Sequence, residues 1–396
     1  MRLISFLGTG RYEETDYTFE GKQYRSKFVA HALAELTHPH EIYVIATQEA
    51  WQQHGEELCR LLKATQHPEP KQVRVPTGGE PQQLWQMFGA IVETLGWAPD
   101  EALLDITHGF RMQPFFAAAC IEYIQAVFPR QPRIRVVYGE FRKDQPSPIW
   151  ELTTFLEVLT WSRNLMLFLH TGQADEVARR TQELGRELRR QWAATDRRDP
   201  RPTLDDLGRA LGVFGQAFVT VRTGALLVGR ERVPPAAEQL SQAITQARHE
   251  VAQHLPALAH VLDQVQLMVQ PLCLQGARLS SLAGQRALIA LARLYRRMGR
   301  YSEAISVVRE GWCTFQAPPQ CDQPGTDEFD DAKRREWDKQ WVHRRNHPDD
   351  TAEVRNDIQH AGFRKHPQQP KWFFEMLDKL LEAWEHDLQQ ASTSSA

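Results

Sequence analysis

The chain has 396 residues, 42% of them hydrophobic, and a formal net charge of −3 at pH 7. This length predicts two domains, because a single hydrophobic core rarely grows beyond about 250–300 residues. The near-neutral charge excludes a protein that grips nucleic acid through a global basic field, so any nucleic-acid site has to be a local patch.

Cysteine usage and the apolar runs indicate the compartment. The five cysteines, at positions 59, 120, 273, 313 and 321, form no Cys-x-x-Cys pair. This spacing argues against a disulfide framework and a zinc ribbon, and fits a reducing compartment. The start, MRLISFLGTG, has too short an apolar run for a signal peptide, and no run approaches the length of a membrane span. We expect a cytoplasmic protein without a membrane partner.

The first 140 residues alternate short apolar runs with amphipathic stretches. The apolar runs predict strands at 3–8, 41–47, 71–79, 101–109 and 133–139, and the stretches between them predict helices at 25–37, 49–64, 81–96 and 112–128. Strands that are apolar throughout and separated by helices indicate a parallel sheet covered on both faces. We therefore predict a doubly wound, Rossmann-like α/β domain over residues 1–145.

From about residue 150 the helical period dominates and no strand pattern returns. Helices are predicted at 151–171, 174–192, 204–228, 236–255, 277–298, 301–314, 350–363 and 371–389. A polar, proline-rich stretch at 317–331 predicts a loop, and residues 391–396 predict a disordered tail. The C-terminal part, residues 150–390, is predicted to be an all-α bundle.

The loops at the carboxyl ends of the predicted strands are the candidate ligand site. In a doubly wound sheet, ligands bind beyond those ends, where the strand order reverses. These loops are rich in glycine, threonine and polar side chains that can surround an anion. The candidate residues are Gly8, Thr9, Gly10, Arg11, Thr47, Gln48, Thr77, Gly78, Thr107, His108, Gly109, Phe110 and Arg111. Together they favour an anionic ligand that is rich in hydroxyl groups or bases.

A dinucleotide-binding site is the obvious alternative for these loops. Gly8 and Gly10 follow the first strand, and Glu49 lies near the end of the second. However, position 13 is a glutamate where that motif needs its third glycine, and a long polar stretch follows Gly10 before the first predicted helix. A pyrophosphate held by a helix N-terminus needs a short turn there. We therefore do not expect NAD.

The stretch RNDIQH places Arg355, Asn356 and His360 on one predicted helix near the C-terminus. A random sequence of this composition would hold about 0.01 copies of Arg-Asn with a histidine four residues after the asparagine. Asn356 and His360 share a helix face, and Arg355 lies at its flank. Imidazole transfers protons near neutral pH, guanidinium stabilises charge developing on a phosphate, and an amide can orient a base. These three are the candidate catalytic residues for cleaving a phosphodiester by its own 2′-hydroxyl.

Two further readings of the histidine pattern stay open. Arg163 and His170 form a similar pattern with two more residues between them, in an apolar helix, and their role is undecided. A solvated helix face without chemistry is the ordinary explanation of a lone histidine.

One chain supplies one Arg-Asn-x-x-x-His motif, whereas acid and base roles need two proton carriers or a shared one. A two-fold dimer would bring two copies together.

Three segments, LGTGRYEET, DITHGFR and RNDIQH, resemble segments of the CRISPR-associated CARF–HEPN ribonucleases, accessory effectors of type III CRISPR systems. The resemblance covers essentially the whole chain and implies a CARF sensor domain at 1–145 and a HEPN domain at 150–390. It implies a homodimer, or a higher oligomer, whose CARF domains bind a cyclic oligoadenylate, with cyclic tetra-adenylate as the favoured ring. Binding would activate a composite endoribonuclease site for single-stranded RNA.

The resemblance also assigns residues. Gly8, Thr9 and Gly10 match the first-strand ligand loop of the family, and the segment Thr107, His108, Gly109, Phe110 and Arg111 matches the fourth-strand loop. Arg355, Asn356 and His360 match the HEPN catalytic motif. A local cationic funnel would hold the RNA, and its candidates are Arg344, Arg345, Arg355, Arg364 and Lys365.

No His, Cys, Asp or Glu constellation in the predicted bundle has metal-ligand spacing, so neither a metal nor another cofactor is expected. Cleavage should then survive EDTA and leave 2′,3′-cyclic phosphate ends. Two other functions stay open. A non-enzymatic ligand-gated regulator would bind the ligand and cleave no RNA. A nucleotide-metabolising enzyme, or a ring nuclease that acts in the α/β domain through Thr9 and Thr107, would keep its turnover in His360→Ala.

Overall fold

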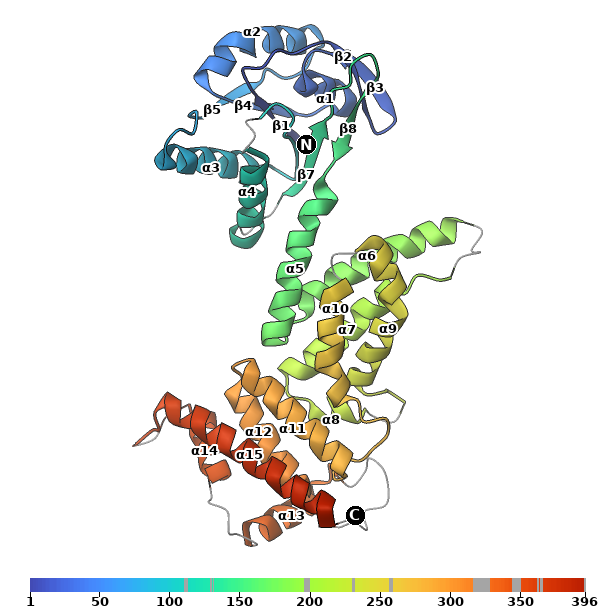
Figure 1. The fold of residues 1–396 in the computed structure, drawn as a ribbon, viewed down its shortest axis with the longest axis vertical. Coiled ribbons are helices and arrows are strands. Elements are labelled where there is room, and N and C mark those ends of the chain that lie inside the picture. Colours follow the sequence, from blue (N-terminus) through green and yellow to red (C-terminus); the bar gives the residue numbers. More distant parts are fainter. Residues whose placement is uncertain are drawn as a thin grey trace. The chain divides into compact units, whose positions relative to one another are not determined.

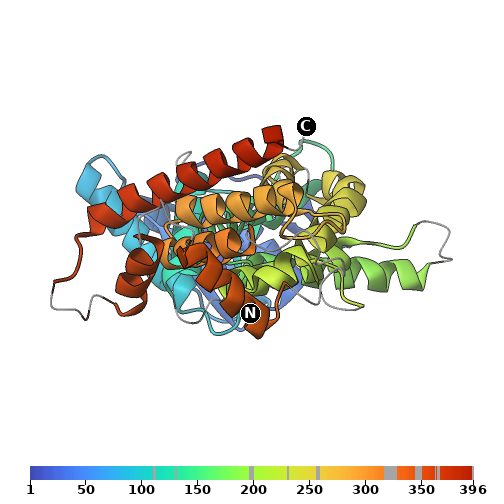
Figure 2. The same cartoon turned by 90° about the horizontal axis from the view of Figure 1, so that it is seen from below.

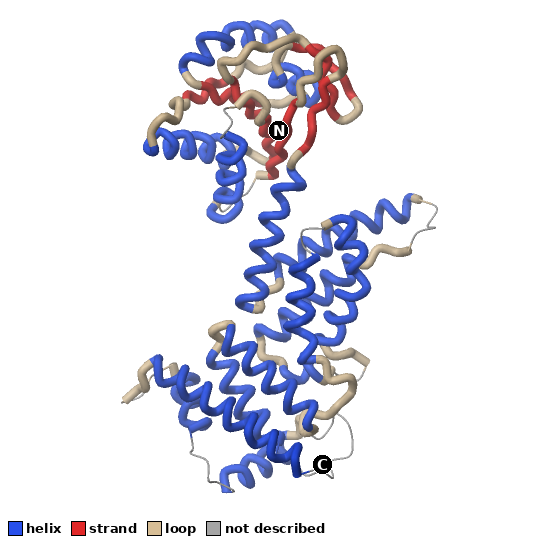
Figure 3. The backbone as a smooth tube through the Cα atoms, in the orientation of Figure 1, coloured by secondary structure: helices blue, strands red, loops and turns tan. Residues whose placement is uncertain are grey.

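The structure is a computed structural model. It describes residues 1–109, 113–128, 130, 132–195, 200–229, 232–255, 259–315, 328–343, 350–361, 363 and 366–394. The chain divides into two compact units, Met1–Thr160 and Trp161–Ala396 (Figure 1). All strands of the described residues belong to the first unit, and the second is helical (Figure 3). The structural division falls after Thr160, and the functional boundaries at residues 145 and 150 stay predictions.

The first unit is built on one sheet with the strand order β3-β2-β8-β7-β6-β1-β4-β5. The strands are β1 Arg2–Leu7, β2 Thr15–Phe19, β3 Lys22–Ser26, β4 Glu41–Ala46, β5 Lys71–Arg74, β6 Glu101–Asp105, β7 Arg133–Gly139 and β8 Ser147–Glu151. β1 pairs in parallel with both β4 and β6, and parallel pairing continues to β5 on one side and to β7 on the other. Strands β4 and β5 lie on one side of β1. After β5 the chain crosses to β6 on the other side of β1, so the strand order reverses beside β1.

Helices cover both faces of this sheet. Helices α1 (Val29–Thr37) and α2 (Gln48–Ala64) lie on one face, and α3 (Pro81–Gly96) and α4 (Gln113–Val127) on the other. Alternate residues of β1 explain its continuous apolar run: Leu3 packs into the core of the α1–α2 face, and Ile4 into the core of the α3–α4 face. The predicted doubly wound α/β domain and its parallel strands are confirmed.

Three strands at the sheet edge were not predicted. β2 and β3 form an antiparallel hairpin, and β8 pairs antiparallel with β7. The hairpin lies in the polar stretch after Gly10. The first helix was expected to begin near residue 25, but β3 extends to Ser26 and α1 begins at Val29. Every second residue of β2 is buried, from Thr15 through Tyr17 to Phe19. This two-residue period is that of a strand with one covered face.

The second unit is all helical, as predicted. Helix α5 (Thr153–Thr171) begins in the first unit, and α6 Asp175–Ala194, α7 Leu204–Val219, α8 Thr223–Leu227, α9 Ala236–His254, α10 Ala259–Val269, η2 Gln270–Leu272, α11 Leu282–Arg297, α12 Tyr301–Phe315, α13 Asp331–His343, α14 Asp350–Gln359 and α15 Pro370–Ser394 follow. Helix α15 packs against α11 and α12 (Figure 2). Large aromatic residues such as Phe214, Tyr295, Trp312 and Trp384 fill one shared core.

The helical unit departs from the prediction in several places. Helices α10 and α13 were not predicted, and the single helix predicted at 204–228 is divided into α7 and α8, with a positive φ of 57° at Val221 between them. Within the expected loop at 317–331, residues 328–331 are described, and Glu328 there is buried. Helix α15 continues through residues 391–394, where a disordered tail was expected, and residues 395–396 lie outside the described residues. In the part of the chain that the structure describes, no helix is long and apolar enough to cross a membrane.

Candidate functional site

A pocket of about 470 Å³ lies at the carboxyl edge of the sheet, beside the reversal of strand order. The loop after β1 and the turn after β6 supply most of its wall, and Gly139 at the end of β7 adds a third side. The predicted residues that line it are Gly8, Thr9, Gly10, Arg11, Thr107, His108 and Gly109. The structure therefore brings together the loops that follow the first and fourth predicted strands.

The remaining predicted ligand residues lie elsewhere. Thr47, Gln48, Thr77 and Gly78 are not among the described residues that line this pocket. Thr47 instead caps α2, where its hydroxyl accepts a hydrogen bond from the N–H of Ala50 at 3.2 Å. The N–H of Gly78 donates to the side chain of Gln83 at 3.1 Å. Phe110 and Arg111 lie outside the described residues.

Sequence reasoning missed several residues of the wall. The pocket is also lined by Tyr12, Glu13, Tyr17, Lys27 and Phe141. The alternation in TDYTF, residues 15–19, is the signal that places Tyr17 on the covered face of β2. Lys27 follows β3 directly, and its ammonium group pairs with Glu57 at 2.6 Å. Tyr17 and Lys27 reach the site because the unpredicted hairpin folds beside the strand ends, and Phe141 reaches it from the segment after β7.

Asp105, at the end of β6, organises the turn that carries the predicted residues. Its carboxylate is fully buried and accepts hydrogen bonds from the hydroxyl of Ser5 at 2.5 Å and from the N–H of Thr107 at 2.9 Å. The hydroxyl of Thr107 also donates to Asp105 and accepts from the N–H of Gly139 at 2.7 Å. This network ties β1, β6 and β7 together, and it uses the Thr107 hydroxyl within the protein.

Tyr12 and His108 contribute rings to the wall of the pocket, and His54 packs behind Tyr12. The ring of Tyr12 lies 4.3 Å from that of His108 and 4.6 Å from that of His54, measured between centroids. His54 is fixed by a 2.9 Å hydrogen bond between its Nε2 and the carbonyl of Gly10. The Nε2 atom of His108 is buried and has no hydrogen-bond partner within the structure.

The charge state of His108 follows from its surroundings. Burial lowers the pKa of His108, Asp105 opposes this effect, and His54 adds to it. The pKa therefore lies below its usual range, and the imidazole is mainly neutral at pH 7. A neutral ring whose Nε2 has no partner in the protein can form one hydrogen bond with a bound ligand.

The predicted catalytic residues lie at the end of α14. Arg355 donates from its Nη2 to the side-chain oxygen of Asn356 at 3.1 Å, and the Nε of Arg355 is buried without a hydrogen-bond partner. The helix ends at Gln359, but the N–H of His360 still bonds to the carbonyl of Asn356 at 3.0 Å. His360 is exposed and precedes Ala361, whose positive φ of 52° ends the helical path.

Asp357 fixes the chain after this turn. Val354 and Asp357 are the buried residues that anchor this part of α14, and the carboxylate of Asp357 accepts from the N–H of Gln368 at 3.0 Å. His360 is exposed at the end of the helix that carries Arg355 and Asn356. The catalytic role of these three residues stays a prediction.

The other predicted charged residues are only partly described. Arg344, Arg345, Arg364 and Lys365 of the proposed funnel lie outside the described residues. Arg163 and His170 lie on α5, and His170 is exposed in its last turn. Their role stays undecided.

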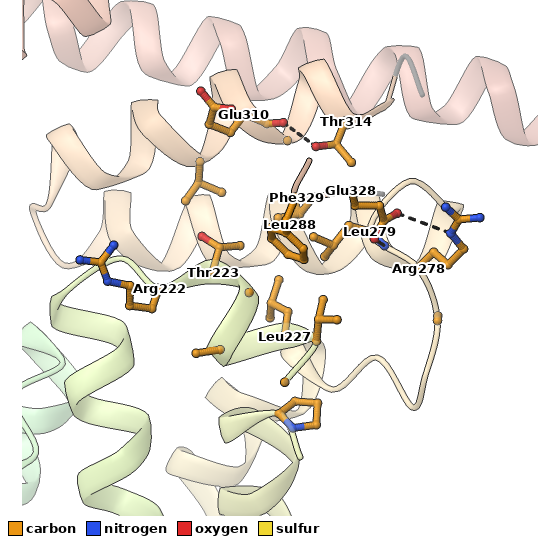
Figure 4. A pocket seen from close by; sticks show the side chains of 18 of the residues that line it. Arg222, Thr223, Leu227, Arg278, Leu279, Leu288, Glu310, Thr314, Glu328 and Phe329 are labelled. Atoms are coloured by element: carbon orange, nitrogen blue, oxygen red, sulfur yellow. Dashed lines mark hydrogen bonds and ion pairs between the residues drawn. The ribbon is translucent and has the colours of Figure 1, made fainter. Parts of the chain in front are cut away.

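A larger cavity, of about 1640 Å³, lies within the helical unit (Figure 4). Helices α8, α11 and α12 and the segments next to them line it, and the predicted catalytic residues are not among its described lining. Two ion pairs lie in its wall: Arg334 bonds to Glu310 at 2.6 Å, and Arg278 lies 3.8 Å from Glu328. Arg222, Arg232 and Glu238 line it as well.

Across the described residues, no group of three or more His, Cys, Asp or Glu side chains is arranged to hold a metal ion. Metal independence of the reaction stays a prediction.

Comparison with known proteins identifies the first unit only. Residues 2–140 match the family model of the CARF domain of the CRISPR system endoribonuclease Csx1. The matched segment contains β1 through β7 and most of the pocket wall. No curated protein matches the chain. The match supports a CARF-containing CRISPR protein, and the HEPN assignment of the helical unit stays a prediction.

Proposed function

We propose, from the CARF domain at its N-terminus, that this chain is an endoribonuclease of type III CRISPR defence that a cyclic oligoadenylate activates. One observation carries the proposal. The loop Gly8–Arg11 and the turn Thr107–Gly109, which are far apart in the sequence, surround one pocket at the reversal of strand order. Ligands of doubly wound folds bind at this place, and the pocket lies within the segment that matches the CARF model.

The wall of the pocket has the chemistry that a cyclic oligoadenylate needs. The glycines of both loops let a phosphate approach the backbone, where N–H groups can bind anions. Lys27 and Arg11 contribute positive charge. The neutral imidazole of His108 can exchange a hydrogen bond with an adenine edge or a ribose hydroxyl. Cyclic tetra-adenylate is the ring that we propose.

The helical unit supplies the reaction in this proposal. An imidazole such as His360 removes the proton of the RNA 2′-hydroxyl, and the resulting oxygen attacks the adjacent phosphorus. The bond to the 5′-oxygen breaks, and that oxygen takes a proton from the second imidazole of the composite site. Arg355 stabilises the negative charge that develops on the phosphate, and Asn356 positions Arg355 or a base. The products are a 2′,3′-cyclic phosphate and a 5′-hydroxyl.

A composite site requires two copies of the chain, and the first unit carries a surface that suits this. Helices α4 and α5 expose four large apolar side chains, which we name the α4–α5 surface: Phe115, Tyr123, Phe155 and Leu159. Phe115 is 79% exposed and Phe155 74% exposed. The hydroxyl of Thr160 on α5 donates to Gln125 on α4 at 2.6 Å and so holds the two helices together. Exposed large apolar residues on adjoining helices are typical of interaction surfaces, and we propose a homodimer through them.

The deciding experiment incubates the purified protein with single-stranded RNA, alone and with cyclic tri-, tetra- or hexa-adenylate. Cleavage should depend on one of the rings, persist in EDTA and disappear in His360→Ala. His386→Ala, which changes an exposed histidine on α15, is the matched control and should cleave normally. Ring binding without any RNA cleavage would instead indicate a non-enzymatic regulator.

A further inference from the structure

The side chain of Tyr12 occupies the backbone groups that follow strand β1. Its hydroxyl accepts a hydrogen bond from the N–H of Gly8 at 2.9 Å and donates to the carbonyl of Gly8 at 2.8 Å. Gly8 is the first residue beyond β1 and lines the pocket. At this edge of a doubly wound sheet, backbone N–H groups are the usual donors to an anionic ligand. Tyr12 therefore uses a donor that the ligand would need.

The ring of Tyr12 packs against aromatic neighbours and against the buried core of the α1–α2 face. It packs between His108 and His54, and its edge contacts Phe28 at a centroid distance of 5.2 Å. Burial is the main cause that raises the pKa of Tyr12 to about 12. The hydroxyl thus stays protonated at neutral pH and keeps its donor role toward Gly8. These are contacts that a side chain can leave by rotation, without a change in the sheet.

We infer that Tyr12 is an internal competitor of the ligand: a phosphate oxygen of the cyclic oligoadenylate binds the N–H of Gly8 only after the hydroxyl of Tyr12 has left it. The inference rests on the proposed function of this pocket. The apparent affinity is then reduced by the fraction of molecules in which Tyr12 has withdrawn.

The competition also favours charged ligands. A phosphate oxygen forms a charge-assisted hydrogen bond with the N–H of Gly8, which is stronger than the bond that the neutral phenol makes. An uncharged ligand would exchange one neutral hydrogen bond for another and gain little. Tyr12 therefore selects for an anion at this position.

The variant Tyr12→Phe tests the inference, because it keeps the ring and removes the hydroxyl. Its dissociation constant for cyclic tetra-adenylate should fall roughly three- to tenfold, the effect of about one hydrogen bond. The gain should lie in the association rate, because a larger fraction of molecules is ready to bind. Calorimetry measures the affinity, and stopped-flow fluorescence measures the rates. Tyr43→Phe, which makes the same change on β4 outside the described lining of the pocket, should bind like the wild type.

Each outcome bears on one proposal in particular. If the wild type binds and the folded Tyr12→Phe variant binds equally or more weakly, the competitor is wrong and the proposed function stands. A gain in affinity that came only from slower dissociation would also overturn the inference. The hydroxyl of Tyr12 would then destabilise the complex after binding, without slowing association. If the wild type binds none of the cyclic tri-, tetra- and hexa-adenylates, the proposed function fails and the inference fails with it.

Discussion

At the scale of single residues, Asp105 and His108 determine the inner part of the CARF pocket. Asp105 is a buried carboxylate that accepts from Ser5 and from both the N–H and the hydroxyl of Thr107. His108 lies three residues after the end of β6 and has a buried Nε2 without a hydrogen-bond partner in the structure. One residue shapes the turn, and the other is the proposed ligand contact.

Replacing Asp105 by Asn should destabilise the protein by about 1–3 kcal/mol, because the amide NH2 would face a donor that is left unsatisfied. Urea denaturation measures the change. Asp100→Asn is the control, since Asp100 is exposed and pairs only at the surface with Arg130. A loss of stability below about 0.5 kcal/mol in Asp105→Asn, comparable with a surface substitution, would show that the network does not hold the turn.

His108 should make stability depend on pH. Its pKa in the folded protein lies below the unfolded value of 6.5, so the unfolded chain binds more protons as the pH falls below that value. This contribution is present above pH 6.5 and is lost as the pH falls through the folded pKa. The thermal midpoint should drop between pH 7 and pH 5, and it should drop less in His108→Gln. An equal drop in the wild type and in His108→Gln would exclude this role. His386→Gln, at an exposed position, serves as the control.

At the scale of elements, Glu328 joins the segment before α13 to the segment before α11. Its buried carboxylate accepts from the N–H groups of Leu279 and Ser280 at 3.2 and 2.8 Å and from the hydroxyl of Ser280 at 2.8 Å. Arg278 lies beside it (Figure 4). The carboxylate of Glu328 thus accepts from the backbone N–H groups that precede α11, and Ser281 is the N-cap of that helix.

Glu328→Gln should lower the free energy of unfolding by about 1–3 kcal/mol, because a side-chain NH2 cannot accept from these donors. Urea denaturation followed by circular dichroism measures the effect on the helical unit. Glu382→Gln, which removes an exposed carboxylate from α15, should leave the midpoint unchanged. Equal midpoints for both variants would mean that other contacts hold the two segments.

At the scale of the whole molecule, the proposal requires two copies of the chain and two kinds of site. The α4–α5 surface is the proposed contact between copies. The pocket in the first unit and α14 in the second share no residue. Any effect of the ligand on RNA cleavage is therefore a coupling free energy between separate sites.

Phe155→Asp should convert the proposed dimer to a monomer, because a carboxylate would lose its hydration within an apolar contact. Light scattering at assay concentrations measures the mass. Leu267→Asp is the control: it places the same charge at a similarly exposed aliphatic position on α10, and it should not change the mass. A dimer that persists in Phe155→Asp would move the interface to another surface.

His360→Ala should lower ligand-activated cleavage by at least about a hundredfold, the usual effect of losing a general acid–base group. It should still bind cyclic tetra-adenylate within about twofold of the wild type, since His360 lies outside the pocket. Calorimetry and an RNA-cleavage assay on the same preparation provide both values. Loss of ligand binding in the folded variant would contradict the picture of two separate sites.

The sequence by itself determined the elements whose period is strong. The apolar runs of β1, β4 and β6 and the helices α2, α3 and α4 were predicted within a few residues, because burial on both faces leaves a continuous hydrophobic signal. The pocket residues Gly8 and His108 could be named as candidates because ligands of doubly wound folds bind at strand ends.

Only the tertiary structure decided which strand ends share a pocket. The loops after β1 and β6 meet because these strands are neighbours at the reversal of order, while the loops after β4 and β5 lie on the other side of β1. The sequence names strand ends but not their order, since the pairing of distant strands is a long-range choice. Tyr12 could not be identified for the same reason: its importance lies in contacts with His54 and His108, residues that approach it only after the sheet and α2 have formed.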